Sequence, residues 1–340
     1  MKERRSDGET IDHRFINIEN KEERKYMKTL NKIVKTAVTA CAVVSLCACS
    51  SSAAASKAAS SSADANKKTG TNSTYAYLLD TTDLPKADLD LSNADGVLKK
   101  VLDEGVLTIS TSPDYPAAEF VDDTGKVYGS EMMLAKYIAD NLGVDLKIET
   151  MDFSATLTAV STGKVDMAIS GFGWKKDREE NYELSKGYQA TSDAACHTLL
   201  VYSDTVDNYK TLDDFAGKHI IAQASSLQEM YVEDEIKDPD LELVTTLDIG
   251  MMSMASHKAD AIALDCDTAK QYAEKSNGQF AKSSVEFDLT PYGDKEGNCM
   301  AAAKGEKSLI EAVNKIIDTA TENNLYQEWY TEAKKQAGIE

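Results

Sequence analysis

The sequence predicts an α/β protein of two lobes, and two observations carry this prediction. The 340 residues are 42% hydrophobic and 28% charged, which is enough material for two ordinary domain cores. Short apolar runs of strand length also alternate with longer segments whose apolar residues recur at helical spacing. This alternation is typical of an α/β sheet that carries ligand-binding loops at the carboxyl ends of its strands.

The first lobe is predicted from strands and helices that follow one another closely. Its strands are expected at 106–110, 146–150 and 165–170, and its helices at 130–142 and 154–162. Gly143 is expected to end the first helix, and Ser154 and Gly163 to cap the second. The unit of strand, loop and helix therefore occurs twice in the first lobe.

The second lobe repeats this pattern. Strands are expected at 219–223, 241–247 and 260–265, and helices at 226–236, 249–259 and 266–276. Two more apolar, strand-like pieces lie at 197–202 and 299–304, and a long helical pattern covers 308–333. If that last segment packs back on the first lobe, the chain crosses between lobes twice. We therefore assign 74–191 plus 298–340 to lobe 1 and 192–297 to lobe 2.

The charge of the body excludes one class of partner. The chain has a formal net charge of −20, and residues 1–48 hold ten Lys and Arg against seven Asp and Glu, so the remainder carries about −23. An acidic body of this kind repels nucleic acid and anionic lipid. We expect no nucleic-acid partner.

The amino-terminal segment has the pattern of an export signal. From Met27, three lysines precede thirteen uncharged residues, 36–48, which is typical of a signal peptide and shorter than the roughly 20 residues of a membrane-spanning helix. Residues 1–26 hold seven charges of each sign, so we expect Met27 to be the true start. The segment LCAC at 46–49 resembles a bacterial lipobox with lipidation at Cys49, and an ordinary signal peptide cleaved nearby is the alternative.

The segment after the predicted signal peptide (1–48) has the composition of a flexible tether. Residues 50–73 contain no aromatic or branched aliphatic residue and are unable to form a core. Together with Cys49 they make a lipidated linker, 49–73, ahead of the folded body.

Three of the six cysteines remain in the body, at Cys196, Cys266 and Cys299. They are far apart in sequence and have no CxxC spacing. For an odd number without paired spacing we favour buried free thiols, and one disulfide plus a spare thiol is the alternative.

Motifs of common enzyme classes are missing from the sequence. No GxSxG, HExxH, GxxxxGK[ST] or paired CxxC occurs, and the four histidines do not cluster. The GFG at 171–173 is a weak signal without the longer dinucleotide spacing. We expect no catalytic residue, no cofactor and no metal.

One arginine stands out, at the end of ISGFGWKKDR (169–178). Arg178 is predicted early in a helix that follows a strand, where its guanidinium reaches the strand end. Arginine pairs bidentately with carboxylates, and the amides at a helix start favour the same anion. The alternative is a surface arginine paired with Glu179 or Glu180.

Five segments in order give the chain a family resemblance. They are LDEGVLTISTSPDYPAAEF, GSEMMLAKYIADNLG, TAVSTGKVDMAISGFGWKKDREE, LDDFAGKHIIAQASSLQE and ADAIALDCDTAKQYA. From about Leu98 to Gly338 the chain resembles a family 3 extracellular solute-binding protein, the amino-acid receptor of ABC importers. The resemblance implies an α/β, two-lobed, periplasmic-binding-protein-like fold of type II, with a ligand cleft between the lobes and two crossing strands.

The resemblance also implies which residues bind the ligand. Arg178 is expected to hold the α-carboxylate and Asp265 the α-ammonium, and a zwitterion losing water needs both. Less specific positions are the aromatic walls Tyr115 and Phe153, the polar backbone of Ser170 and Gly171, and Ser226 with Gln228 at a helix start. The alternatives are a turn for Tyr115, core packing for Phe153 and a plain N-cap for Ser226. Trp174 is equally a pocket wall or a hydrophobic staple.

Several positions depart from the family pattern. The chain has YPAAEF at 115–120 where the family usually has YPPFEF, and DCD at 265–267 where it usually has DEP. Gly173 replaces a frequent Thr or Ser, and Ser225 replaces the usual glycine. These departures put the identity of the ligand in doubt.

Two positions bear on the ligand side chain. Ser112 lacks the acid that basic-amino-acid receptors often have, which disfavours lysine or arginine. Gln223 is placed to hydrogen-bond a polar side chain, so a polar amino acid is expected.

The resemblance implies a monomeric, lipid-anchored receptor outside the cytoplasm. It captures a free amino acid and presents the closed form to an ABC permease and its ATPase, and no bond is made or broken. A sensory lipoprotein is one alternative. A dehydratase of cyclic carboxylic acids is another, with Glu119 as its general acid.

Overall fold

The computed structural model describes residues 73–188, 196–292 and 297–339. They all belong to one compact unit, Asn66–Glu340. The predicted signal peptide, start codon, lipidation site and all but the last residue of the tether lie outside the described residues and stay predictions. No helix within this part of the chain has the length and apolar character needed to span a bilayer.

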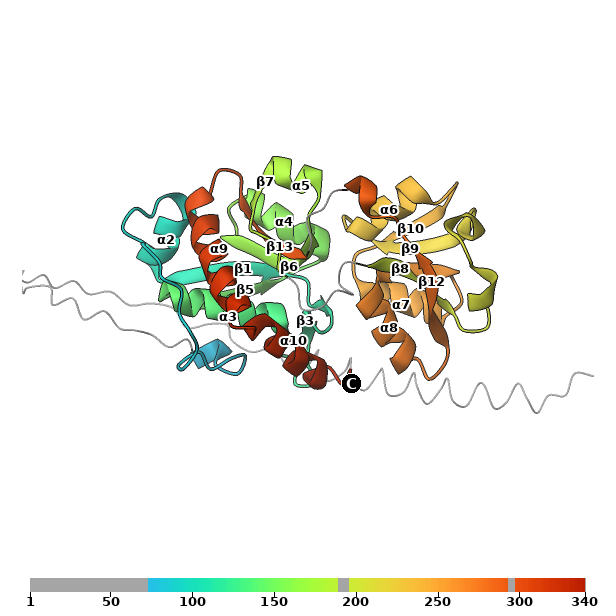
Figure 1. Cartoon of the computed structure of the whole chain (residues 1–340), viewed down its shortest axis with the longest axis horizontal. Helices are drawn as coiled ribbons and strands as arrows, with labels where there is room; N and C mark the ends of the chain where they lie inside the picture. The colour runs from blue at the N-terminus through green and yellow to red at the C-terminus, as the bar shows by residue number, and fades with distance from the viewer. Residues whose placement is uncertain (1–72, 189–195, 293–296, 340) are drawn as a thin grey trace, which may run out of the picture. The chain divides into compact units, whose positions relative to one another are not determined.

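The first lobe is built on a five-stranded mixed sheet (Figure 1). Its strands are β1 (Val106–Thr111), β5 (Asp145–Thr150), β6 (Met167–Gly173), β7 (Tyr182–Leu184) and β13 (Asn298–Ala303). Its helices are α2 (Gly96–Glu104), α3 (Ser130–Leu142), α4 (Phe153–Ser161), α5 (Lys176–Asn181), α9 (Lys307–Glu322) and α10 (Leu325–Gln336). The strand order is β5-β1-β6-β13-β7, with β1 parallel to β5 and β6, and β13 antiparallel to β6 and β7.

The second lobe repeats this arrangement. Its strands are β8 (His197–Tyr202), β9 (His219–Gln223), β10 (Asp240–Val244), β11 (Ala261–Asp265) and β12 (Phe280–Glu286), and its helices are α6 (Leu227–Glu235), α7 (Leu247–Ala255) and α8 (Cys266–Lys275). The order is β10-β9-β11-β8-β12, with β9, β10 and β11 parallel and β8 antiparallel to β11 and β12. In both lobes three parallel strands end at the same edge, where loops bind ligands in such sheets.

Smaller elements complete the description. A three-stranded sheet in the order β2-β3-β4 joins β1 to α3, with β2 (Asp114–Tyr115), β3 (Glu119–Val121) and β4 (Val127–Tyr128). Short 3-10 turns lie at Ser73–Tyr75, Val206–Asn208, Leu212–Phe215 and Thr290–Tyr292. The small sheet places Tyr115 and Glu119 beside the carboxyl end of β6.

The carboxyl-terminal segment packs on the first lobe, as α9 and α10 do in Figure 1. The apolar face of α9 and Trp329 of α10 join the core around α3, where the Trp329 and Tyr137 rings are 5.3 Å apart. The helical pattern predicted over 308–333 forms two helices, α9 and α10. Asn324 takes a left-handed conformation with φ 56° between them, and asparagine tolerates this conformation better than most residues.

Two predicted helix caps are wrong, both on α4. Helix α4 begins at Phe153 after Asp152, so Ser154 lies inside its first turn. The Gly143 prediction is confirmed, because Gly143 is left-handed with φ 71° and its amide bonds back to the last turn of α3. At the end of α4 the C-cap is Thr162, one residue before the predicted Gly163.

The cysteine prediction is corrected, because Cys196 and Cys266 form a disulfide. The register of β8 against β11 explains the pairing: His197 lies opposite Asp265, so the residues just before and just after them meet. The Cys266 amide donates to the Cys196 carbonyl at 2.8 Å, and the two Cα atoms are 5.3 Å apart, within the usual range for a disulfide. The Cys299 thiol is buried and donates to the Phe172 carbonyl.

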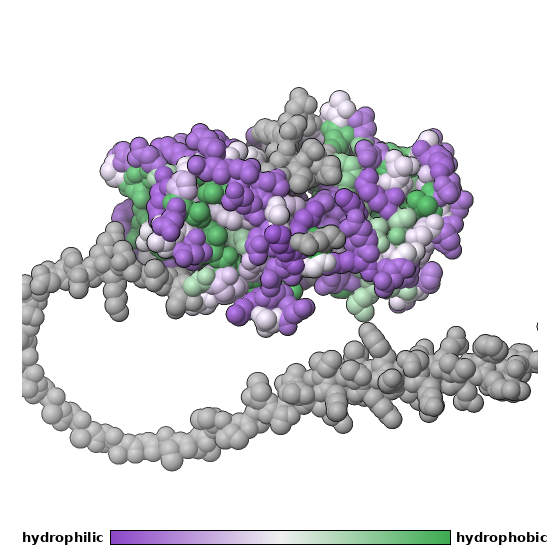
Figure 2. Space-filling model, turned by 60° about the horizontal axis from the view of Figure 1, so that its bottom comes forward, coloured by the Kyte–Doolittle hydropathy of each residue, from purple (hydrophilic) through white to green (hydrophobic). Residues whose placement is uncertain are grey.

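The chain passes to the second sheet between Tyr188 and Cys196 and returns between Tyr292 and Gly297. The predicted lobe limits fall in or beside these two passages, which include residues outside the description, and they stay predictions. We call 73–188 with 297–339 the first lobe and 196–292 the second. Figure 2 shows one face of the molecule, where hydrophilic residues cover most of the described surface and hydrophobic ones form small separate patches.

Candidate functional site

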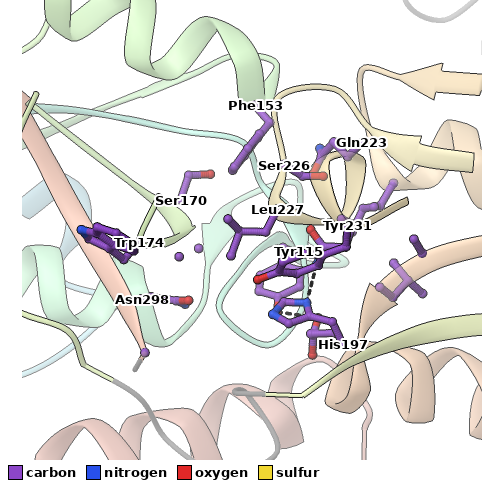
Figure 3. A pocket seen from close by; sticks show the side chains of 18 of the residues that line it. Tyr115, Phe153, Ser170, Trp174, His197, Gln223, Ser226, Leu227, Tyr231 and Asn298 are labelled. Carbon is purple, nitrogen blue, oxygen red and sulfur yellow. Dashed lines mark hydrogen bonds between the residues drawn. The ribbon is translucent and has the colours of Figure 1, made fainter. Parts of the chain in front are cut away.

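A cavity of about 480 Å³ is lined by residues of both lobes. Figure 3 shows Ser170, Trp174 and Asn298 on its first-lobe side, and Gln223, Ser226 and Tyr231 on its second-lobe side. The structure brings all ten predicted ligand residues to this cavity: Tyr115, Phe153, Ser170, Gly171, Gly173, Arg178, Gln223, Ser226, Gln228 and Asp265. Their roles in binding stay predictions.

Arg178 is a buried cation in the cavity wall. Its side chain comes from α5, directly after β6, and the residue is 5% exposed. Nη1 donates to the Gly173 carbonyl at 2.7 Å, and Nη2 donates across the lobes to the Ser225 carbonyl at 2.6 Å. The guanidinium also lies 5.7 Å from the Phe153 ring centre and 5.3 Å from that of Phe172. Burial lowers the pKa of Arg178, so an anion in the cavity would relieve a desolvated positive charge.

Asp265 is a buried acid on the second-lobe side. It ends β11 and caps α8, where Oδ1 accepts from the Thr268 amide at 2.9 Å. Oδ2 accepts from the Tyr115 hydroxyl of the first lobe at 2.6 Å. Burial, followed by the Asp265 charge, raises the pKa of Tyr115 well above its ordinary value, so this hydroxyl stays a donor. A carboxylate oxygen accepts more than one bond, which leaves Asp265 able to accept from a ligand cation.

Asp114 makes further hydrogen bonds between the lobes, and sequence reasoning missed it. Its Oδ2 accepts from the Leu247 amide at the start of α7 at 2.8 Å and from Gln223 Nε2 at 2.9 Å. Its Oδ1 accepts from Ser112 Oγ at 2.8 Å. Burial raises the pKa of Asp114 above its ordinary value, and the hydrogen bonds from the Leu247 amide and Ser112 Oγ oppose this rise. Gln223, expected to face a ligand side chain, is thus held by Asp114.

Ser170 and Gly171 form the cavity wall at the end of β6. Ser170 Oγ donates to Glu119 Oε1 at 3.1 Å and accepts from the Ser112 amide at 2.9 Å. Gly171 has φ 58°, and a Cβ there would lie 3.2 Å from the Tyr115 ring. Glycine suits this position because L side chains rarely adopt positive φ.

Gly173 faces a residue of the opposite lobe. A Cβ on Gly173 would lie 2.4 Å from Leu227 Cδ1, so the space of the usual hydroxyl side chain is taken by Leu227. Ser225 stands where the family usually has glycine. Its φ of 67° explains the usual glycine, because glycine adopts this conformation without strain. Ser226 is an N-cap, as its Oγ accepts from the Glu229 amide at 3.1 Å, and it lines the cavity as well.

His197, Tyr231 and Asn298 also line the cavity and were missed. His197 begins β8, and its Nδ1 lies 3.1 Å from Gln228 Nε2, so the amide donates and the imidazole accepts. Burial lowers the pKa of His197 to about 4. No spacing in the sequence indicates these residues, because the strand register alone places His197 opposite Asp265.

The described residues offer one group with the spacing of metal ligands, formed by Cys196, Cys266 and Glu286. Two of these three are joined in the disulfide, so their sulfur atoms are not thiolates. Arg178 is the one Lys or Arg among the described residues that line the cavity, and the buried acids Asp114, Glu119 and Asp265 line it too. A buried cation in one lobe and a buried acid in the other complement a small zwitterion.

Comparisons with known proteins agree with this chemistry. A model of the bacterial extracellular solute-binding proteins, family 3, matches residues 107–333. The chain is 25% identical over 223 residues to the L-cystine-binding protein TcyJ of Escherichia coli K12, covering 66% of this chain and 80% of that protein. It is 28% identical over 221 residues to a probable histidine-binding protein of Campylobacter jejuni, covering 65% of this chain and 81% of that protein.

A solved structure is similar as well. It is an amino acid ABC transporter substrate-binding protein from Streptococcus pneumoniae bound to L-arginine, with TM-score 0.65 and 30% identity over 71% of this chain and 98% of that chain. This similarity and the two mixed sheets confirm the predicted two-lobed type II fold.

Proposed function

The chain belongs to the bacterial extracellular solute-binding proteins of family 3, and from this premise we propose that it captures a free amino acid outside the cytoplasm for an ABC importer. The observation that carries the proposal is the burial of Arg178 and Asp265 in one cavity. Arg178 takes the α-carboxylate, and Asp265 takes the α-ammonium. Each charged end of the amino acid loses water and gains an opposite partner.

Capture is coupled to closure of the two lobes. Arg178 belongs to the first lobe and Asp265 to the second, so a bound amino acid contacts both. Bonds from Arg178 to Ser225 and from Tyr115 to Asp265 already join the lobes around the cavity. Closure about a hinge is a known switching mode, and the closed form is what the permease and its ATPase recognise.

The ligand is a polar amino acid. The missing acid at Ser112 does not argue against a basic side chain, because the Asp114 carboxylate lies 2.8 Å from Ser112 Oγ in the cavity wall. Relatives are named for L-cystine and histidine, and one is bound to L-arginine. These three amino acids are the first to test.

The protein is a monomer anchored through lipid at Cys49, and it makes or breaks no bond in its ligand. Glu119, the general acid of the enzyme alternative, is buried in the cavity wall and accepts a hydrogen bond from Ser170 Oγ at 3.1 Å, which supports a structural role for it. Incubation with prephenate or arogenate tests this point, since any product would support the enzyme.

A thermal-shift screen against the twenty amino acids and L-cystine tests the proposal. A ligand that binds only the folded state raises the melting temperature by mass action. Arg178→Ala and Asp265→Ala should each abolish the shift, because removing one partner of a buried charge pair costs about 2–5 kcal/mol, or about 30-fold or more in affinity. Lys176→Ala, an exposed cation on the same helix, is the matched control and should keep the shift. No shift with any amino acid would contradict the proposal.

A further inference from the structure

Two buried carboxyl side chains meet in the wall of the first lobe. Glu119 on β3 is 1% exposed and lines the cavity, and Glu131 in the first turn of α3 is fully buried. The chain brings them together because the Glu131 amide donates to the Ala118 carbonyl at 3.0 Å. Two carboxylates in such a place would repel each other strongly.

The hydrogen bonds assign one proton to this pair. Glu119 and Glu131 lie within hydrogen-bonding reach of each other, and a bond between two carboxyl groups requires a proton because carboxylates only accept. Glu131 accepts from the Gly171 amide at 2.8 Å, the Tyr188 hydroxyl at 2.8 Å and Asn298 Nδ2 at 3.1 Å. Glu119 Oε2 is buried and, among the described residues, receives no N–H or O–H donor. Glu131 is therefore the carboxylate, and Glu119 is the acid that donates to it.

The partners of the pair connect the cavity with the passages between the lobes. Gly171 lies in the cavity wall, and Ser170 beside it donates to Glu119. Tyr188 is the last described residue before the passage to the second lobe, and Asn298 is the first residue of β13 after the return. Tyr188 and Asn298 also pair through their backbones, with N···O distances of 2.8 Å and 2.7 Å.

We propose that Glu119 and Glu131, sharing one proton, act as a positioning pair that holds Ser170 and Gly171 in place and ties them to Tyr188 and Asn298. The tie joins the ligand-facing backbone to the described residues that flank the two passages of the chain. The effect on amino-acid affinity rests on the proposed function, whereas the shared proton and the position of Gly171 do not.

The arrangement has a definite pH dependence. The titratable neighbours of the pair among the described residues include Tyr188, Asp114 on β2 and Tyr326 on α10. Burial, followed by the Glu131 charge, raises the pKa of Glu119 well above its ordinary value of 4.5. As the pH rises above 4.5, an unfolded Glu119 ionises while the folded one keeps its proton, so the pair's contribution to stability falls with rising pH.

The substitution Glu119→Gln tests the shared proton, because it keeps the hydrogen bonds of Glu119 and removes its ionisable group. The glutamine amide donates to Glu131 and its carbonyl accepts from Ser170, so both bonds are kept without an ionisable proton. At pH 7 the infrared difference spectrum of wild type minus Glu119→Gln should contain the C=O stretch of a protonated carboxyl. A difference limited to carboxylate bands would overturn the shared proton.

The position of Gly171 is read from its amide in the protein without added amino acid. Its proton shift and hydrogen-exchange protection at pH 7 should be unchanged in Glu119→Gln and in the exposed control Glu104→Gln. In Glu131→Gln, which loses the carboxylate acceptor, protection should fall by about tenfold or more, the scale of a hydrogen bond to a charged group. Equal protection in Glu131→Gln and wild type would overturn the positioning role, and misfolding of that variant would show in the whole spectrum and leave the infrared test to decide.

Affinity for the amino acid with the largest thermal shift gives the last readout. Wild type should lose affinity as the pH is raised, by about tenfold or more where Glu119 ionises, whereas Glu119→Gln should bind equally across the range. The same pH dependence in both proteins would overturn the coupling to binding. A screen without any hit would refute the proposed function and leave the two spectroscopic tests standing.

Discussion

Asp114 is predicted to act as a latch between the lobes, and Asp114→Asn tests this. The Asp114 carboxylate is acceptor-only, and its Oδ2 receives two donors from the second lobe, the Leu247 amide and Gln223 Nε2. An asparagine in that place keeps its carbonyl oxygen toward these two donors and turns its amide to Ser112 Oγ, which accepts, so both bonds between the lobes lose their charged acceptor. The variant therefore weakens bonds that exist only when the lobes are together.

The magnitude follows from the charge that the acceptor loses. A hydrogen bond to a charged group contributes about 1.5–3 kcal/mol and a neutral one about 0.5–1.5 kcal/mol, so each of the two bonds loses about 1–1.5 kcal/mol. Closure should become about 30 to 150 times less favourable. Where closure is required for binding, the apparent affinity falls by the same factor.

Two assays read this out. Isothermal titration calorimetry measures the dissociation constant for the amino acid with the largest thermal shift, and small-angle X-ray scattering measures the radius of gyration at a subsaturating amount of it. Asp114→Asn should bind more weakly and scatter as a more open particle. Asp248→Asn is the matched control, because Asp248 follows Leu247 on α7 and acts on Asp114 only through its charge. Equal affinity and scattering in Asp114→Asn and wild type would refute the latch.

Three further changes test other parts of the structure. Cys196→Ser with Cys266→Ser should lower the free energy of unfolding by about 4 kcal/mol in urea, because the disulfide closes a loop of sequence separation 70; the same stability for oxidised and reduced wild type would refute the disulfide. Gly173→Thr should weaken amino-acid binding, since its Cβ would lie 2.4 Å from Leu227, and Leu227→Ala should restore binding; a Gly173→Thr variant with wild-type affinity contradicts this packing. Burial lowers the pKa of His197 from 6.5 to about 4. Between these two pH values His197 is protonated in the unfolded chain and neutral in the folded one, so the free energy of unfolding should fall as the pH drops from about 6.5 to about 4. The urea midpoint of His197→Gln should fall less than that of wild type between pH 7 and pH 5, and parallel curves would be evidence against a neutral buried His197.

Sequence periodicity predicted most of the fold, for a physical reason. Strands such as 219–223 are short apolar runs bounded by polar residues, and helices such as α3 end at a glycine that can turn left-handed. Both signals are local. The break between α9 and α10 was missed because the apolar pattern continues across it, and only the backbone of Asn324 shows the turn.

The charged residues of the site, Arg178 and Asp265, were predicted because each lies in a sequence segment typical of the family. Asp265 ends a predicted strand, Arg178 stands early in the helix that follows one, and the family resemblance indicated that both bind the ligand. A disulfide was only the less favoured alternative, and its pairing and the role of Asp114 were not predicted, because each depends on strand register or on contact between the lobes. The partners of Asp114 and of Cys196 are far away in sequence, and no local pattern indicates such pairs.

The most direct test of the central claim is a crystal structure of the protein with the amino acid that gives the largest thermal shift. The account predicts the ligand carboxylate within hydrogen-bond distance of the Arg178 guanidinium and the ligand ammonium within hydrogen-bond distance of the Asp265 carboxylate. A ligand bound elsewhere, or bound in this cavity with its two charged ends away from both side chains, would contradict it.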